Sequence, residues 1–204
     1  MDKEKIIRLF NDELSLINNS SFRDLVILVL ADKVEEDYFF IPASMTSKYH
    51  PAICNLKHGL LVHIKLTCAY CKMLIDALLD EGKQKKQDLI ITACLLHDIS
   101  KKGKYAKYND YKNHPLIASL IVQSYIDENI ILLNEIEKQE QQELTNLIKF
   151  HSGIFTPSEF KKSIYNYSLN ELIIYLADYM ASRKNQNHNP YIENKHKLIS
   201  EILA

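Results

Sequence analysis

Two aspartates stand where the amino-acid pattern predicts buried helix. Residues 89–96 are nearly apolar on every helical face, and His97 and Asp98 follow them directly. Asp178 interrupts a second apolar run, at 173–180. A buried carboxylate is costly unless it is hydrogen-bonded, ion-paired or bound to a metal. The two acids therefore indicate one shared cation.

Histidines recur at positions that would face the same interior. His63 lies one helical turn from Leu60, His151 shares a stripe with Leu147, and His114 opens a further helix. Each histidine alone would fit a packed core or surface residue. Together with the acids they fall on five separate predicted helices, as expected when a bundle projects ligands into a shared centre. The candidate ligands, which suit iron, manganese or zinc, are His63, His97, Asp98, His114, His151 and Asp178.

This pattern resembles the HD phosphohydrolase superfamily, in which a histidine, a His-Asp doublet and a distant aspartate ligate a metal. The matching motifs are Gly59-Leu60-Leu61-Val62-His63, the doublet in residues 95–101 and residues 177–183. The closest resemblance is to the HD domain of bacterial 3′-to-5′ exoribonucleases, because residues 38–44 precede the first motif in a similar way. Those enzymes also carry an OB domain, for which this sequence shows no counterpart.

The resemblance implies one or two divalent metal ions: manganese or iron, zinc, nickel or cobalt, with magnesium also compatible. His63, His97, Asp98 and Asp178 would hold the first ion, and Asp98 would bridge to a second ion held by the remaining two histidines, His114 and His151. Asp98 and Lys101 would be the catalytic residues. The substrate contacts would come from Lys101, Arg183 and His58.

Three functions follow as hypotheses. The first is hydrolysis of phosphoester or phosphoanhydride bonds in nucleotides, the second is 3′-to-5′ trimming of single-stranded nucleic acid, and the third is a non-catalytic nucleotide-binding regulatory module. The net charge of -1 gives no global attraction for nucleic acid. Residues 101–108 interleave cations with tyrosines, which would either stack a base or form a solvated loop.

The elements that must position these residues are helices. Only 4 Gly and 5 Pro interrupt 204 residues rich in helix formers, so we expect an all-α, single-domain helical bundle of the HD type. Its parts would be N-terminal helices at 1–37, the HD core at 38–184, and a loop with a short helix at 185–204. A loop at 38–56 would lie across something functional. Helices are predicted at 2–18, 22–34, 58–81 ending at Gly82, 87–98, 114–129, 131–151 and 169–184.

The cysteines and the length of the apolar runs predict a cytoplasmic protein without a membrane span. Cys54, Cys68, Cys71 and Cys94 lie in or beside apolar stretches, so we expect reduced thiols and a cytoplasmic protein. Cys68 and Cys71 fit core packing better than a metal site. The longest uncharged apolar run, 25–31, is far below the roughly 20 residues that span a bilayer. The expected partners are a nucleotide or short nucleic acid and, as in related proteins, a second copy of the chain in a homodimer, with no membrane.

Overall fold

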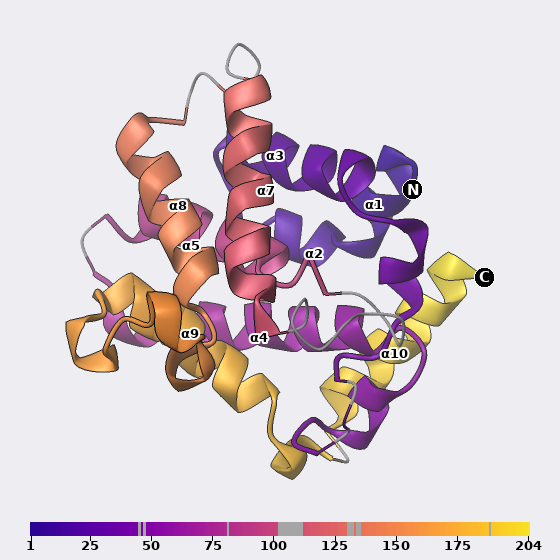
Figure 1. Ribbon diagram of the computed structural model, residues 1–204. Coiled ribbons are helices and arrows are strands. Elements are labelled where there is room, and N and C mark those ends of the chain that lie inside the picture. The colour runs from indigo at the N-terminus through magenta and orange to yellow at the C-terminus, as the bar shows by residue number, and fades with distance from the viewer. Residues whose placement is uncertain are drawn as a thin grey trace.

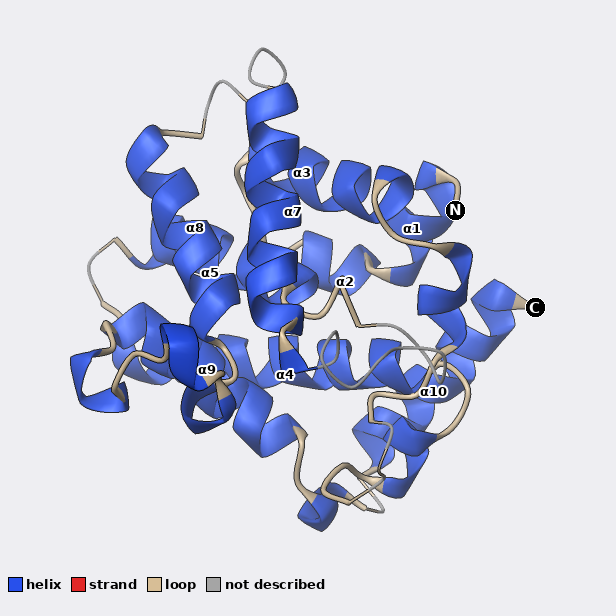
Figure 2. Cartoon of the chain, viewed as in Figure 1, coloured by secondary structure: helices blue, strands red, loops and turns tan. Residues whose placement is uncertain are grey.

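The computed structural model describes residues 1–44, 46, 48–80, 82–101, 112–129, 133, 136–187 and 189–204. Across these residues the regular structure is helical, without a strand (Figure 2), which confirms the all-α prediction. The interleaved loop of cations and tyrosines lies outside the described residues from Lys102 onward. None of the described helices combines the length and apolar character needed to cross a bilayer.

The α-helices are α1 (Lys3–Leu9), α2 (Asn11–Leu14), α3 (Ser20–Asp32), α4 (Gly59–Leu78), α5 (Lys83–Leu96), α7 (His114–Glu128), α8 (Lys138–Phe150), α9 (Leu169–Ala181) and α10 (Pro190–Leu203). Short 3₁₀ turns fill the connections: η1 (Glu36–Phe40), η2 (Ala52–Asn55), η3 (Gly153–Phe155), η4 (Ser158–Phe160), η5 (Ile164–Asn166) and η6 (Lys184–Gln186).

Helix α4 is the centre of the arrangement (Figure 1). It packs against α9, α5 and α10, while α7 and α8 stand side by side and α8 closes over α5 and α9. Helix α3 packs on α5, α1 packs on α3, and α10 returns to contact α1. Both chain ends consequently lie at the right of the view. The helices with the predicted ligands therefore meet around one interior.

Two helices contain stretches that are buried around their whole circumference. Every residue from Gly59 to Cys68 in α4 is buried, as is every residue from Gln87 to Leu96 in α5. The apolar pattern of 89–96 predicted this for α5. Two charges are included. Asp88 of α5 is 5% exposed, and its carboxylate accepts hydrogen bonds from the backbone N–H groups of Asn18 and Asn19. Lys65 of α4 is 1% exposed, and its ammonium lies 2.6 Å from a carboxylate oxygen of Glu13 in α2.

Several predicted helix ends were wrong. Gly82 has the expected positive φ of 64°, but it caps the start of α5, whose first residues are Lys83 to Lys86, instead of ending α4. Helix α4 already stops at Leu78, because Leu79 is extended. The predicted helix 2–18 breaks at Phe10. The final helix is 14 residues long, longer than the short one expected, because an apolar stripe packs it on α4.

The remaining ends differ by up to seven residues. Helix α8 begins at Lys138, where Glu137 and Glu140 form a reciprocal capping box, instead of at 131. Helix α9 ends at Ala181, three residues before the predicted end. Helix α5 ends at Leu96, so His97 and Asp98 occupy the turn that follows the helix.

Candidate metal centre

The His-Asp doublet emerges from the buried end of α5. His97 is the C-cap of that helix, and its Nδ1 lies 2.6 Å from the carbonyl oxygen of Cys94, three residues earlier. A carbonyl can only accept, so this nitrogen carries the proton and Nε2 is left for another partner. Nε2 lies 3.2 Å from Oδ2 of Asp98, and both side chains are fully buried.

His151 repeats this arrangement on α8. It is the C-cap of that helix, and its Nδ1 lies 2.7 Å from the carbonyl oxygen of Ile148, again three residues earlier. Its Nε2 points to Oδ1 of Asp98 at 3.7 Å and lies 3.1 Å from the hydroxyl of Ser152. A helix-end carbonyl that would otherwise lack a partner thus sets the orientation and tautomer of each ring.

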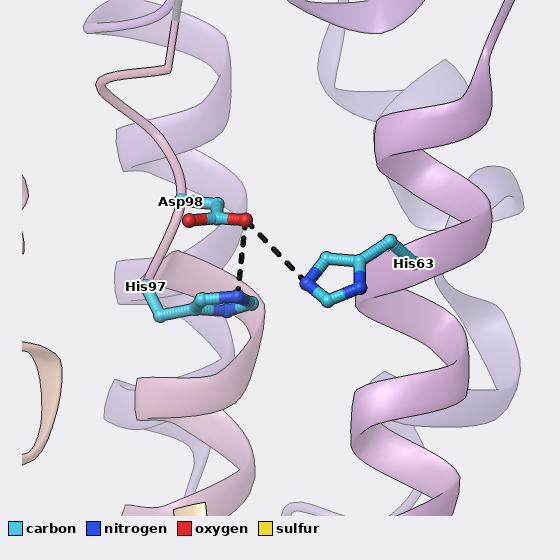
Figure 3. A group of neighbouring side chains, drawn as sticks. All are labelled: His63, His97 and Asp98. Carbon is cyan, nitrogen blue, oxygen red and sulfur yellow. Dashed lines mark ion pairs between the residues drawn. The ribbon is translucent and has the colours of Figure 1, made fainter. Parts of the chain in front are cut away.

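His63 and Asp178 approach from two further helices. Nε2 of His63, on α4, lies 3.6 Å from Oδ2 of Asp98, and Figure 3 shows the ring directed at the doublet. Asp178, on α9, places Oδ1 3.0 Å from the same His63 nitrogen and 3.8 Å from Nε2 of His97. Packing of α4 on α9 is what brings these side chains together.

His114 completes the cluster from the start of α7. Its Nε2 lies 3.1 Å from Oδ1 of Asp98 and 3.2 Å from Nε2 of His151. The hydroxyl of Ser100 donates to the backbone carbonyl of His114 at 2.8 Å, which ties the doublet turn to α7. The structure therefore brings all six predicted ligands into one cluster, in which five are buried and the Asp178 side chain is 18% exposed.

Two groups within this cluster could each hold a metal ion. The first is His63, His97 and Asp98, and the second is Asp98, His114 and His151; within each group the ligand atoms lie within 4.8 Å of one another. Asp98 belongs to both groups, with Oδ2 toward the first and Oδ1 toward the second. A single carboxylate thus joins two sets of imidazoles.

Unsatisfied buried atoms test whether a metal fits. Both nitrogens of His63, Nε2 of His97 and both carboxylate oxygens of Asp98 are buried without a partner in hydrogen-bond geometry. Buried polar groups of this kind are rare and costly unless something binds them. Nε2 of His63, Nε2 of His97 and Oδ2 of Asp98 face one another, which is the arrangement that a divalent cation requires, so the residues fit a metal.

The protonation states agree with this fit. Burial lowers the pKa of His63, and burial together with repulsion from His97 and His114 lowers the pKa of His151 to about 3, so both rings are neutral. Burial would raise the pKa of Asp98, but the charges of His97 and Lys101 outweigh it and hold that pKa well below its usual range. Neutral imidazole and ionised carboxylate are the forms that bind metal. His97 differs: burial would lower its pKa, but the neighbouring Asp98 carboxylate raises it, so a bound metal would have to displace a proton from this ring.

A cavity of about 250 Å³ opens onto the cluster. Lys101 lines it, with its ammonium 2.6 Å from Oδ2 of Asp98, and Arg183 lines it from beyond the end of α9. His58, the third predicted substrate contact, does not line it. The His58 ring packs against Phe40 instead, and its Nδ1 lies 2.7 Å from the carbonyl oxygen of Phe39. Its position gives no support to a substrate contact.

Sequence reasoning missed several cavity residues. His50 lines the cavity, packs edge-on against the His63 ring at 5.1 Å between centroids, and lies 3.2 Å from the hydroxyl of Ser182. Phe155, Tyr175 and Tyr179 also line it. The signal for His50 was its place in the 38–56 loop, which was expected to lie across something functional and which here forms part of the cavity wall.

Comparison with models of protein families shows to which family the chain belongs. The model of the HD domain matches residues 60–183, more than half of the chain. The chain belongs to the HD-domain family. Most members of this family are metal-dependent hydrolases, and HD domains bind divalent metals. Comparisons with curated proteins and with solved structures found no match.

Proposed function

We propose that this HD domain is a metal-dependent phosphohydrolase that cleaves phosphoester bonds of nucleotides by attack of water. The observation that carries the proposal is the buried Asp98, whose two oxygens face two separate histidine sets, with the Lys101 ammonium 2.6 Å from Oδ2. A purely structural core would not retain so many unsatisfied polar atoms at one point.

The candidate ligand set would hold one or two divalent ions. Bound metal supplies a nucleophile from water near neutral pH and positive charge for the phosphoryl oxygens. Imidazole and carboxylate together suit manganese, iron or zinc. The carbonyl contacts of His97 and His151 keep Nε2 of each ring directed inward, so the ligands need little reorganisation.

Two cations of the chain would act on the substrate. Lys101 is 8% exposed and lines the cavity beside Asp98, where its ammonium can donate to a phosphoryl oxygen as a compact charge. Arg183, two residues beyond the end of α9, also lines the cavity, and its Nε donates to the carbonyl oxygen of Tyr179 at 3.0 Å. This contact holds the guanidinium toward the cavity, where its other N–H groups can grip phosphate.

The direct test combines metal analysis with hydrolysis. The purified protein is assayed for bound metal by elemental analysis and for manganese-dependent hydrolysis of nucleotides, a generic phosphodiester and a short oligonucleotide. We expect stoichiometric metal and nucleotide hydrolysis. Asp98→Asn should lose both, because it removes the carboxylate common to the two groups. His196→Ala is the control, since His196 is a half-buried histidine that lies outside the cluster.

The results separate the alternatives. If folded Asp98→Asn hydrolyses as fast as wild type, the metal mechanism is wrong. Oligonucleotide trimming without nucleotide hydrolysis would favour the 3′-to-5′ exonuclease. Nucleotide binding without hydrolysis under any metal would favour the regulatory module. His151→Ala reports on the second group: a fall from two bound ions to one would show that both groups bind metal.

A further inference from the structure

Aromatic side chains gather on one wall of the cavity. Tyr49, Phe155, Tyr175 and Tyr179 line it, and they come from three separate segments of the chain. Phe155 is 58% exposed, Tyr49 45% and Tyr179 37%. Large apolar surface left in water is unfavourable, and a cluster of it around a cavity beside reactive groups indicates a ligand surface.

The wall is held in place by close packing. Gly153 has a φ of 54°, and a Cβ at this position would lie 2.1 Å from the Tyr175 ring. The backbone of η3 therefore rests directly on that ring, and η3 carries Phe155 at its end. Tyr175 in turn contacts Tyr179 with ring centroids 6.2 Å apart. The aromatic rings are thus positioned before any ligand arrives.

Arg183 extends the flat surface. Its guanidinium lies 3.9 Å from the centroid of the Tyr179 ring and 5.3 Å from that of Tyr49. The neighbouring residues also meet, because Nε2 of His50 lies 3.2 Å from the hydroxyl of Ser182. The 49–50 and 182–183 segments are therefore joined by two contacts. Planar rings and a planar cation are the groups on which nucleobases stack.

The cavity combines this wall with groups that attract an anion. The Lys101 ammonium lines the same space and supplies positive charge, to which a bound metal ion would add; the neutral His151 ring and the Asp178 carboxylate lie beside it. A ligand that fills it carries a phosphate and a flat, largely apolar part. At about 250 Å³ the cavity is smaller than the roughly 300–1,000 Å³ of most small-molecule sites, so it encloses one nucleotide at most.

We propose that the base of a single nucleotide packs against the wall of Tyr49, Phe155 and Tyr179, with one face stacked on Phe155, and that its phosphate lies at the histidine and aspartate cluster. The position of the phosphate rests on the proposed function; the base-stacking residues are an addition to it. Stacking tolerates every base, because each base has a π face. The wall selects nucleotides over phosphates that lack a base without choosing among bases.

Binding measured without turnover tests this directly. Isothermal titration calorimetry of the manganese-loaded protein compares non-hydrolysable phosphonate analogues of adenosine 5′-monophosphate, cytidine 5′-monophosphate and ribose 5-phosphate. We expect both nucleotides to bind wild type more tightly than the sugar phosphate. Phe155→Leu should raise the Kd for the nucleotides by roughly 5- to 150-fold, the loss of one stacking contact, and leave ribose 5-phosphate unchanged. Tyr165→Leu is the control, because Tyr165 is 94% exposed and does not line the cavity.

Other results of these binding measurements would overturn the stacking proposal or the proposed function. Equal affinity for nucleotides and ribose 5-phosphate, or equal weakening of both by Phe155→Leu, would overturn the stacking proposal. An oligonucleotide that binds more tightly than the mononucleotides would overturn its restriction to one nucleotide. Hydrolysis with manganese is measured separately. Phe155-dependent binding without hydrolysis leaves the stacking proposal standing and refutes the proposed function. Hydrolysis of ribose 5-phosphate as fast as the nucleotides would refute the stacking proposal and leave phosphohydrolase activity standing.

Discussion

The buried ion pair between Lys65 and Glu13 makes a quantitative prediction. Lys65 is 1% exposed and Glu13 3%, and the ammonium and carboxylate are 2.6 Å apart. The ammonium also lies 5.0 Å from the ring centroid of Phe10. Water cannot compensate either charge if its partner is removed. Lys65→Met should therefore cost about 3–5 kcal/mol of unfolding free energy, the range for breaking a buried pair.

The double variant carries the decisive comparison. In Glu13→Leu with Lys65→Met no charge remains to desolvate, so the unfolding free energy should return to within about 1 kcal/mol of wild type or exceed it. At this chain length the single variant corresponds to a fall in Tm of roughly 6–20 °C. Urea and thermal unfolding, followed by circular dichroism at pH 7, measure both quantities.

A second ion pair of equal length provides the control. Lys195 lies 2.6 Å from Asp12, but the Asp12 side chain is 61% exposed. Lys195→Met should cost at most about 1 kcal/mol, because exposed pairs are screened by solvent. Burial does not determine the contribution of the pair if Lys65→Met lowers the unfolding free energy no more than Lys195→Met does. The same conclusion follows if the double variant loses the sum of the unfolding free energies lost by Lys65→Met and by Glu13→Leu alone.

Three further predictions concern packing, thiols and metal. Burial raises the pKa of the Cys54 thiol to about 12 and the other three thiols are also buried, so a thiol reagent at pH 8 should react with all four only after unfolding. Gly59→Ala places a Cβ 2.0 Å from a backbone carbonyl oxygen and should cost about 3 kcal/mol in urea unfolding, against about 1 kcal/mol for Gly82→Ala, whose nearest atom is 4.0 Å away. Manganese at 100 times its Kd should stabilise wild type by about 2.7 kcal/mol and leave the Tm of Asp98→Asn unchanged.

The centre of the site could be predicted because its charged residues interrupt apolar helical stretches. A helix that is apolar on all faces must be buried, so the carboxylate of Asp98 at its end demanded a partner without any knowledge of the fold. The same reasoning found Asp178. Lys65 presents a similar contradiction within α4, but its partner Glu13 is 52 residues away along the chain. The sequence shows that such a charge needs a partner and does not show which one.

The rest of the site depends on tertiary packing and local backbone geometry. His58 was assigned to the substrate because it adjoins the first motif, yet its positive φ of 66° and the Phe39 carbonyl turn its ring to another side of the helix start. His50 reaches the cavity through contacts with α4 and the end of α9, which no local pattern encodes. Gly82 has the positive φ that usually follows a helix end, but here it directly precedes α5, and the sequence pattern around it does not distinguish the two positions.

The C-cap positions of His97 and His151 restrict where the chain can change length. Each residue of an α-helix advances about 100° around the axis, so one residue inserted in the last turn of α5 or α8 would swing the imidazole away from Asp98. An insertion before either helix leaves its last turn in register and only lengthens a connection. Loop grafting and domain insertion should therefore be tolerated ahead of Gly82 and ahead of Glu137, and rejected at the opposite ends of the same two helices.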